Sequence, residues 1–454
     1  MGRIFRHNAF QISVCLLIGI ITVLSAYYNR KHGAVSLVFD GSDIYMDAIN
    51  TIFDSCRQDL YTNQGNVYPP ALTFLLRVLF RAFCEAGFLN AKNLRAELLP
   101  YLMLIHFLMI FSVGFILGRV VFKLQRSIII AFAASTVASF WPPLIFGVDR
   151  MNLILVPFFL FILSFYLPIS ILRKGNDKLA LWNICIFISV LAGTLFKPYF
   201  LVQYGLIFIL DFFGRRSLNV KRSIVAIKYF LGLLLIFFVN YFPFASGDFT
   251  GGITIWLRNL SIFQGSVSVN SSHIWNMSYN SLSVFAASRI MPAVNMPDFL
   301  NHPLIGSSLA LVVFCLSAQL IFTIYTCLCF AKLMHLRVFL RATHPQSISI
   351  MLDLSIVVLS IVIMSSLFTS FGYYTGIFWV ILVTIALSLG SRQECVLIAI
   401  LSLLFMAFSA SSTFLWPSSS IPSASFLYIL TVFSCSILVR RIAASSNLDT
   451  RWLA

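Results

Sequence analysis

The sequence predicts an all-helical, polytopic membrane protein. Of its 454 residues, 59% are hydrophobic and only 10% are charged, and the mean hydropathy is +0.93. Soluble globular proteins are about 45–50% apolar and about 25% charged. Long apolar runs recur along the chain, and short basic groups separate them. These observations argue against a water-soluble protein and predict one transmembrane domain over residues 1–454.

Apolar runs of near-bilayer length, about 20 residues each, predict about twelve transmembrane helices. They lie near residues 10–27, 98–118, 127–147, 151–172, 179–196, 198–213, 224–245, 303–331, 350–369, 372–390, 395–411 and 423–439. The first run follows a basic start without a small-residue cleavage site, so we expect a retained helix. Lys197-Pro198 alone divides the long run from 179 to 213.

The basic residues predict the orientation of these helices. They gather in alternate connections, which carry Arg119, Lys123 and Arg126; Arg173, Lys174 and Lys178; Arg215, Arg216, Lys221 and Arg222; Lys332, Arg337 and Arg341; Arg392; and finally Arg440 and Arg441. Cytoplasmic loops of membrane proteins carry such an excess, which places both termini in the cytoplasm. Because the basic residues are dispersed, the net charge of +16 predicts no nucleic-acid partner.

The segment Tyr68–Phe83 is apolar but is not expected to cross the membrane. A crossing here would invert the charge alternation of every later connection, whereas Arg77 and Arg81 at helical spacing fit a helix lying in the interface. Residues 28–97 therefore form a first external region, and residues 246–302 form a second. Cys56 and Cys84 both fall in the first, where the sequence leaves a disulfide open.

The first external region begins with an acidic cluster, Asp40, Asp43 and Asp47, in a chain with only 15 Asp and Glu. The apolar positions after it follow the rhythm of an amphipathic helix. These positions are Tyr45, Ala48, Ile49, Ile52, Phe53 and Cys56. Asp43 suits a helix N-cap and Asp47 a solvated face, so capping is the structural alternative to a functional role.

Polar residues at the predicted external ends suggest a site that handles a phosphate-linked sugar. Arg150 and Lys197 stand alone in charge-poor external connections, and such cations can bind a phosphate at the interface. An Asp of the acidic cluster can take the proton of an attacking hydroxyl. Further candidate substrate ligands are Tyr68, Asn152, Arg258, His273, Trp275, Asn276 and Asn280. The structural alternatives are an interfacial aromatic belt and, for Arg150, snorkelling or pairing with Asp149.

Four motifs in this order resemble the GT-C glycosyltransferases, closest to family 87 and its PimE-type α-mannosyltransferases. They are "SDIYMDA" around Asp43, "YPP" at Tyr68-Pro69-Pro70, "DRMN" at Asp149 to Asn152, and "KP" at Lys197, followed by "WNMSYNSL" in the second external region. The family pattern has Gly where Met151 stands. The resemblance covers about the first 290 residues, and the last third is generic.

The resemblance implies a GT-C-like fold with amphipathic interface helices in the first external loop. It also implies inverting transfer of a hexose or pentose from a polyprenyl-phosphate donor to a hydroxyl of a glycolipid or glycan acceptor. A first-loop Asp would be the base, Asp43 by its spacing and Asp40 as the alternative. No cofactor is expected, although an Asp40-x-x-Asp43 pair leaves a divalent cation open. The location implied is a bacterial inner membrane, with the site on the external, periplasmic face. An endoplasmic reticulum enzyme would have the same topology, with the site on the lumenal face.

Two other functions remain open from the sequence. An O-antigen polymerase or ligase also has many helices and external Arg residues, but a long late external loop would favour it and the informative loops here are early. A polysaccharide flippase or transporter would keep ionisable residues near the bilayer centre. Asp211, Lys228 and Asp353 instead lie near predicted cytoplasmic ends, and only His106 is expected to lie deep.

Overall fold

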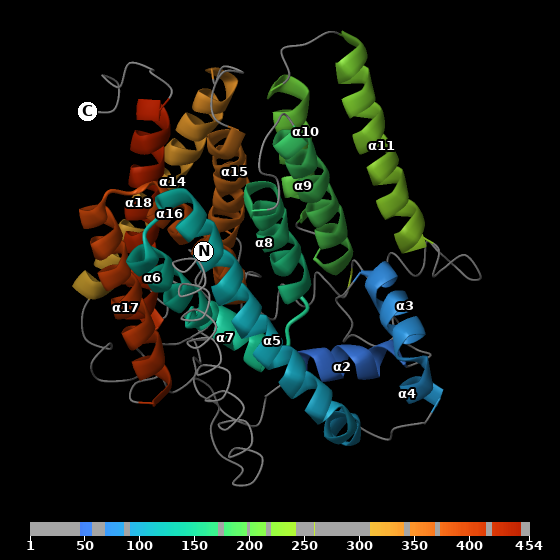
Figure 1. Cartoon of the computed structure of the whole chain (residues 1–454). Coiled ribbons are helices and arrows are strands. Elements are labelled where there is room, and N and C mark those ends of the chain that lie inside the picture. The colour runs from blue at the N-terminus through green and yellow to red at the C-terminus, as the bar shows by residue number, and fades with distance from the viewer. Residues whose placement is uncertain are drawn as a thin grey trace, which may run out of the picture.

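A computed structural model describes residues 46–56, 69–85, 91–170, 177–197, 200–214, 219–241, 258, 309–339, 346–367, 373–414 and 420–445. These residues are helical apart from a few short turns (Figure 1). The elements are α2 Met46–Ser55, α3 Pro70–Leu79, α4 Arg81–Glu85, α5 Ala91–Gln125, α6 Ile128–Ser139, α7 Pro142–Asp149, α8 Leu155–Ser170, α9 Asp177–Phe196, α10 Phe200–Gly214, α11 Asn219–Tyr241, α14 Leu309–Phe339, α15 Gln346–Leu367, the 3-10 helix η4 Tyr373–Phe378, α16 Trp379–Leu389, α17 Arg392–Phe414 and α18 Ser420–Ser445.

Within the part of the chain that the structure describes, five helices are long and apolar enough to cross a membrane, which indicates a multi-pass membrane protein. Their candidate spans are Leu104–Gln125, Arg222–Asn240, Leu320–Arg337, Ser347–Met364 and Leu427–Ala444. Six shorter apolar helices accompany them within the described residues. The all-helical class is thereby confirmed, and the count of about twelve crossings stays a prediction. The expected first helix at 10–27 lies outside the described residues.

The break expected at Lys197-Pro198 is present. Helix α9 ends at Phe196 and α10 begins at Phe200, and the Phe200 N–H donates to the Lys197 carbonyl at 3.1 Å. The α10 helix starts with the fully buried ring of Phe200, which packs against those of Phe161 and Phe378 at centroid distances of 5.8 Å each. Gly193 faces this ring, and a Cβ there would come within 2.9 Å of it. The turn is therefore fixed by packing as well as by proline.

The apolar run over 127–147 forms two helices, so it is not one continuous helical span. Helix α6 ends at Ser139, and the separate helix α7 starts at Pro142. Proline lacks the N–H that a continuing helix needs, and two consecutive prolines, Pro142 and Pro143, follow Trp141. The Trp141 indole donates to the Gly376 carbonyl at 2.8 Å, which ties the break to η4. The run expected over 372–390 is likewise divided, into η4 and α16.

Helix α3 is too short to cross the membrane, as expected from the charge alternation. Its ten residues extend about 15 Å, against about 30 Å of bilayer hydrocarbon. Figure 1 shows α2, α3 and α4 together at the end of the bundle where α7 lies. Phe74, Leu75, Val78 and Leu79 are exposed on α3 beside Arg77, as in a helix lying in a membrane interface.

The main core lies around α15 and α16, whose described side chains are buried almost throughout. Helix α11 stands at the edge of the bundle and exposes most of its apolar side chains, as a lipid-facing helix would (Figure 1). Helices α5 and α6 approach closely at Gly114, where a Cβ would collide with Ser139 Oγ.

The opposite end of the bundle, away from α2 and α7, contains helix ends that the basic residues predict to be cytoplasmic. Gln125 Nε2, at the end of α5, donates to the carbonyls of Leu387, Ser388 and Gly390 at 2.9–3.1 Å. Glu394, at the start of α17, accepts from Arg441 near the end of α18 at 2.7 Å. We call this the predicted cytoplasmic end, and the end with α2 and α7 the predicted external end.

Candidate functional site

Asp47 lies at the centre of a polar cluster at the predicted external end. Its Oδ1 accepts hydrogen bonds from Arg150 Nε at 3.0 Å and Nη2 at 2.8 Å, and its Oδ2 accepts from Asn152 Nδ2 at 2.8 Å. The Asp47 N–H donates to the Arg150 carbonyl at 3.1 Å, which satisfies a helix-start donor that has no partner within α2. The cluster therefore binds the start of α2 to the turn between α7 and α8. We call these three residues the external cluster.

The α7–α8 turn holds Arg150 and Asn152 in place. The N–H groups of Met151 and Asn152 donate back to the carbonyls of Val148 and Gly147, at 3.0 and 2.9 Å. Met151 has φ of 49°, a left-handed conformation that costs a residue with a Cβ about 1–2 kcal/mol. Asn152 Oδ1 accepts from the Ile154 N–H at 3.0 Å, so its amide nitrogen is left to donate to Asp47.

A second hydrophobic core packs next to the external cluster. It joins the apolar faces of α2, α3 and α5 and contains Ala48, Ile49, Ile52, Leu72, Leu76, Leu98, Leu102 and Met151. The apolar face predicted for the first-loop helix is thus confirmed at Ala48, Ile49 and Ile52. Met151 is 5% exposed within this core, and this burial offsets the cost of its backbone conformation.

A disulfide between Cys56 and Cys84, with Cα atoms 5.0 Å apart, joins the end of α2 to α4. The sequence alone leaves this bond open. Disulfides persist in oxidising compartments, so the bond agrees with an external position for the first loop. Helix α3 is held as well, because the Ala71 N–H donates to Asn240 Oδ1 of α11 at 3.3 Å.

The structure brings some of the predicted site residues together. Arg150 and Asn152 are adjacent in the external cluster, and Lys197 follows Phe196, which packs against the second core. Arg258 is exposed. The other candidates lie outside the described residues: Asp40, Asp43, Tyr68, His273, Trp275, Asn276 and Asn280.

The expectation that Asp47 lies on a solvated face is wrong. Its side chain is 16% exposed, and both carboxylate oxygens accept hydrogen bonds. For Arg150, Asp47 is a partner that the sequence reasoning did not name. The helical pattern contained a signal for the burial of Asp47. Asp47 and Thr51 are four residues apart and lie on the same side of the helix, at the border of its apolar face. Thr51 is buried as well.

The external cluster can hold a loop helix in one position over the end of the bundle. An Arg–carboxylate pair with a further amide donor is a charge-assisted arrangement with a defined direction. Because both Asp47 oxygens are bound, this carboxylate is suited to positioning rather than to proton transfer. Among the described residues, no three His, Cys, Asp or Glu side chains gather as metal ligands.

Comparisons of the chain with protein-family models, with curated proteins and with solved structures gave no match. The resemblance to the GT-C glycosyltransferases therefore stays a prediction.

Proposed function

We propose that this protein is a membrane glycosyltransferase that acts at the external face. It would move a hexose or pentose from a polyprenyl-phosphate donor to a hydroxyl of a glycolipid or glycan acceptor. A first-loop Asp would take the acceptor's proton as the hydroxyl attacks the anomeric carbon, and polyprenyl phosphate would leave.

The observation that supports the proposal best is the hydrogen-bonded contact between Asp47 and Arg150. Asp47 and Arg150 are 103 positions apart and come from two motifs that are expected to share one active site. Arg150 donates two side-chain hydrogen bonds to Asp47, and Asn152 of the same motif donates a third. A site built from the first loop and the α7–α8 turn requires this proximity. The left-handed backbone of Met151 adds support, because glycine, the residue of the family pattern, adopts it without strain.

The geometry suggests how the roles divide. We assign Asp47 and Arg150 to positioning, since each binds the other and together they fix the start of α2. Asp43 precedes Asp47 by four residues in the sequence and is the proposed base, with Asp40 as the alternative. The donor phosphate is assigned to Lys197, aided by polar residues of the second external region, 246–302.

The test is transfer by the purified, detergent-solubilised protein, with short-chain polyprenyl-phosphate sugars as donors and a glycolipid extract as acceptor. The readout is released polyprenyl phosphate. Asp43→Asn is expected to lose about 10²–10⁴-fold in rate, the usual contribution of a general base. Asp40→Asn tests the alternative base. Glu394→Gln, a carboxylate at the opposite end, is the matched control and should keep its rate.

Two results would contradict the proposal. If both Asp40→Asn and Asp43→Asn turn over at the wild-type rate, the acidic cluster has only a structural role. If folded wild-type protein releases nothing from any donor, the donor class is wrong. Lipid-diphosphate oligosaccharides should then be tried, as for a polymerase or ligase, followed by transport assays in vesicles.

A further inference from the structure

Helix α3 has apolar side chains on two faces. One face packs inward, with Leu72 and Leu76 in the second hydrophobic core. The other face exposes four large apolar side chains, each at 42–66% of its surface: Phe74, Leu75, Val78 and Leu79. Water is an unfavourable surrounding for so much apolar area on a helix of ten residues. The exposed face of α3 is therefore expected to have a covering partner.

A hydrogen bond between α3 and α11 indicates the depth of α3 relative to the bilayer. The Ala71 N–H donates to Asn240 Oδ1 at 3.3 Å. Asn240 is the last residue of the candidate span Arg222–Asn240, so Ala71 lies at the outer edge of the hydrocarbon. From this edge α3 leads to α4, which lies with α2 at the predicted external end (Figure 1). Because α3 adjoins the exposed apolar helix α11, lipid is the expected covering partner.

Arg77 is exposed at the border of this apolar face. It follows the exposed Phe74 by three positions and the buried Thr73 by four, which places it between the two faces of the helix. Six residues of helix separate Arg77 from Ala71, a length of about 9 Å. The headgroup layer extends about 5–7 Å beyond the hydrocarbon, so the long Arg77 side chain can reach it. Within the described part of the chain, no ion pair includes Arg77.

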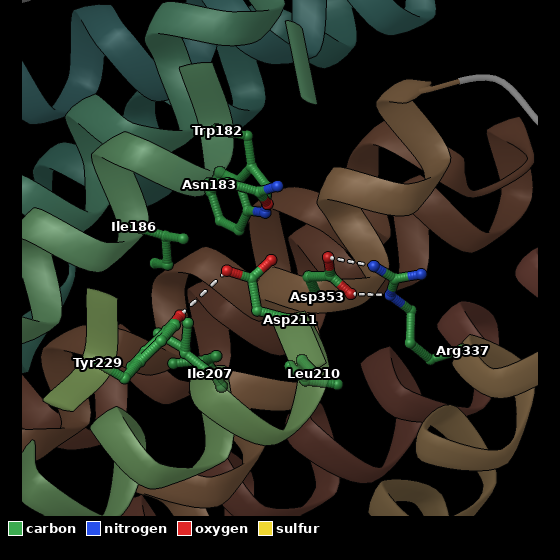
Figure 2. Close-up of a pocket in the computed structure, with 10 residues that line it drawn as sticks. Trp182, Asn183, Ile186, Ile207, Leu210, Asp211, Tyr229, Arg337 and Asp353 are labelled. Atoms are coloured by element: carbon green, nitrogen blue, oxygen red, sulfur yellow. Dashed lines mark hydrogen bonds and ion pairs between the residues drawn. The ribbon is translucent and has the colours of Figure 1, made fainter. Parts of the chain in front are cut away.

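Other arginines of the protein have a carboxylate partner. Arg81, one turn after Arg77, bonds Glu85 at 2.6 Å. Arg337, within the bundle, donates two hydrogen bonds to Asp353 (Figure 2). A cation at the membrane edge is stabilised by an anion, so the counter-charge of Arg77 is expected outside the protein. Phosphate groups are the anions of the headgroup layer, and a guanidinium binds a phosphate through two parallel hydrogen bonds.

We propose that α3 carries a binding site for an anionic phospholipid of the external leaflet. Arg77 donates hydrogen bonds to the lipid phosphate, and the exposed apolar face of α3 packs against the acyl chains. An anionic headgroup suits the site better than a zwitterionic one, because the ammonium group of a zwitterionic lipid competes with Arg77 for the phosphate. This lipid site does not depend on the proposed transfer activity.

A lipid bound at α3 would help to set the depth of the external cluster. Leu72 and Leu76 of α3 share the second core with Met151 of the α7–α8 turn. The Cys56–Cys84 disulfide adds a covalent connection between α4, which follows α3, and α2. Movement of α3 within the interface would therefore move both parts of the external cluster, the start of α2 and the turn.

The test is photo-cross-linking of the full-length protein in phosphatidylcholine nanodiscs. The probe is a trace of phosphatidylglycerol with a diazirine near its glycerol backbone, and mass spectrometry locates the adducts. Adducts on α3 are normalised to those on α11. We expect labelled α3 in the wild type and about fivefold fewer α3 adducts in Arg77→Gln, the usual contribution of one surface arginine to anionic-lipid binding. Unlabelled phosphatidylglycerol, added at constant probe level, should lower the labelling of α3 more than that of α11.

Two control variants distinguish binding at Arg77 from a general effect of positive charge. Arg81→Gln is the matched control and should keep the wild-type labelling, because Arg81 is already bonded to Glu85. Arg77→Lys keeps the charge and should lose less than Arg77→Gln. Unlabelled α3 beside labelled α11 would overturn the proposal, and so would equal labelling of α3 in the wild type, Arg77→Gln and Arg81→Gln. Displacement of the probe by a polyprenyl phosphate at a far lower mole fraction than by phosphatidylglycerol would overturn it in favour of a docking site for the donor lipid.

Discussion

The external cluster differs from a second set of ion pairs, Lys228–Asp211 and Arg337–Asp353, which we call the inner cluster. Both pair Asp with basic residues, but they hold different kinds of structure. The external cluster joins a short loop helix to a turn, and a backbone hydrogen bond and an Asn amide reinforce its ion pair. The inner cluster joins helices that side-chain packing already holds together. Its carboxylates are also more buried, at 8% exposure against 16% for Asp47. The same pair of residue types therefore attaches a loop helix in one place and joins helices of the bundle core in the other.

The largest expected effect comes from breaking one pair of the inner cluster. Arg337→Ala leaves the Asp353 carboxylate buried without its main partner, and such a loss typically costs about 3–5 kcal/mol. The double variant Arg337→Met/Asp353→Leu removes both charges and should unfold near the wild-type temperature. Thermal unfolding of the detergent-solubilised variants measures both. Equal losses in the single and double variants would mean that the ion pair itself stabilises the bundle.

A smaller loss is expected when the external cluster is broken. Arg150→Ala removes two hydrogen bonds to Asp47, but water can replace part of them at a side chain that is 16% exposed. We expect a cost of about 1–3 kcal/mol. Limited proteolysis should show α2 cut faster, while the bundle helices keep their resistance. If Arg150→Ala destabilises the whole protein as much as Arg337→Ala, the two clusters do not differ as described.

How much the sequence predicts depends on whether the signal is local. The apolar face of α2 and the break at Lys197 follow from spacing and proline, and both are present. The helix break at Trp141 also has a local cause, the two prolines that follow it. It was not predicted, because these prolines lie within a continuous apolar run. In each of these cases the residues concerned lie within a few positions of one another.

The partners within both clusters could not be predicted in the same way. Asp47 and Arg150 are 103 residues apart, and their contact depends on where α2 lies relative to α7. The pattern placed Asp211, Lys228 and Asp353 near one end of the bundle. It did not give the rotation of α10, α11 and α15 that turns their side chains toward one cavity. Rotation and long-range order are set by packing, which hydropathy does not encode.

Substitutions at Met151 test whether the turn that carries Arg150 and Asn152 has a strained backbone. Met151→Ala loses the packing of the second core and keeps the strained backbone, whereas Met151→Gly loses the same packing and removes the strain. The glycine variant should therefore be more stable than the alanine variant by about 1 kcal/mol, against the usual order within a helix. Thermal unfolding of the two variants measures the difference. An alanine variant that is equally or more stable would mean that φ at this position is not left-handed.

The smallest expected effect comes from a third acidic site, which is held at the surface of the predicted cytoplasmic end. Glu394 bonds Arg441 at 2.7 Å and Arg440 at 3.2 Å, and it accepts from the Ser391 N–H at 2.6 Å. Partial burial raises the pKa of Glu394, but the hydrogen bonds from Arg441 and Ser391 outweigh it and lower the pKa to about 2. The two arginines are 55% and 43% exposed, so the expected contribution is below about 1 kcal/mol.

The sign of the pH dependence follows from the direction of this shift. A carboxyl group whose pKa is lower in the folded state than its ordinary value of 4.5 stabilises the protein fully above that value. The contribution falls as the pH drops below 4.5 and is lost as the pH passes about 2. The unfolding temperatures of wild type and Glu394→Gln should therefore differ at neutral pH, and the difference should shrink on acidification and at high salt. A constant difference over this range would instead assign the effect of Glu394 to packing.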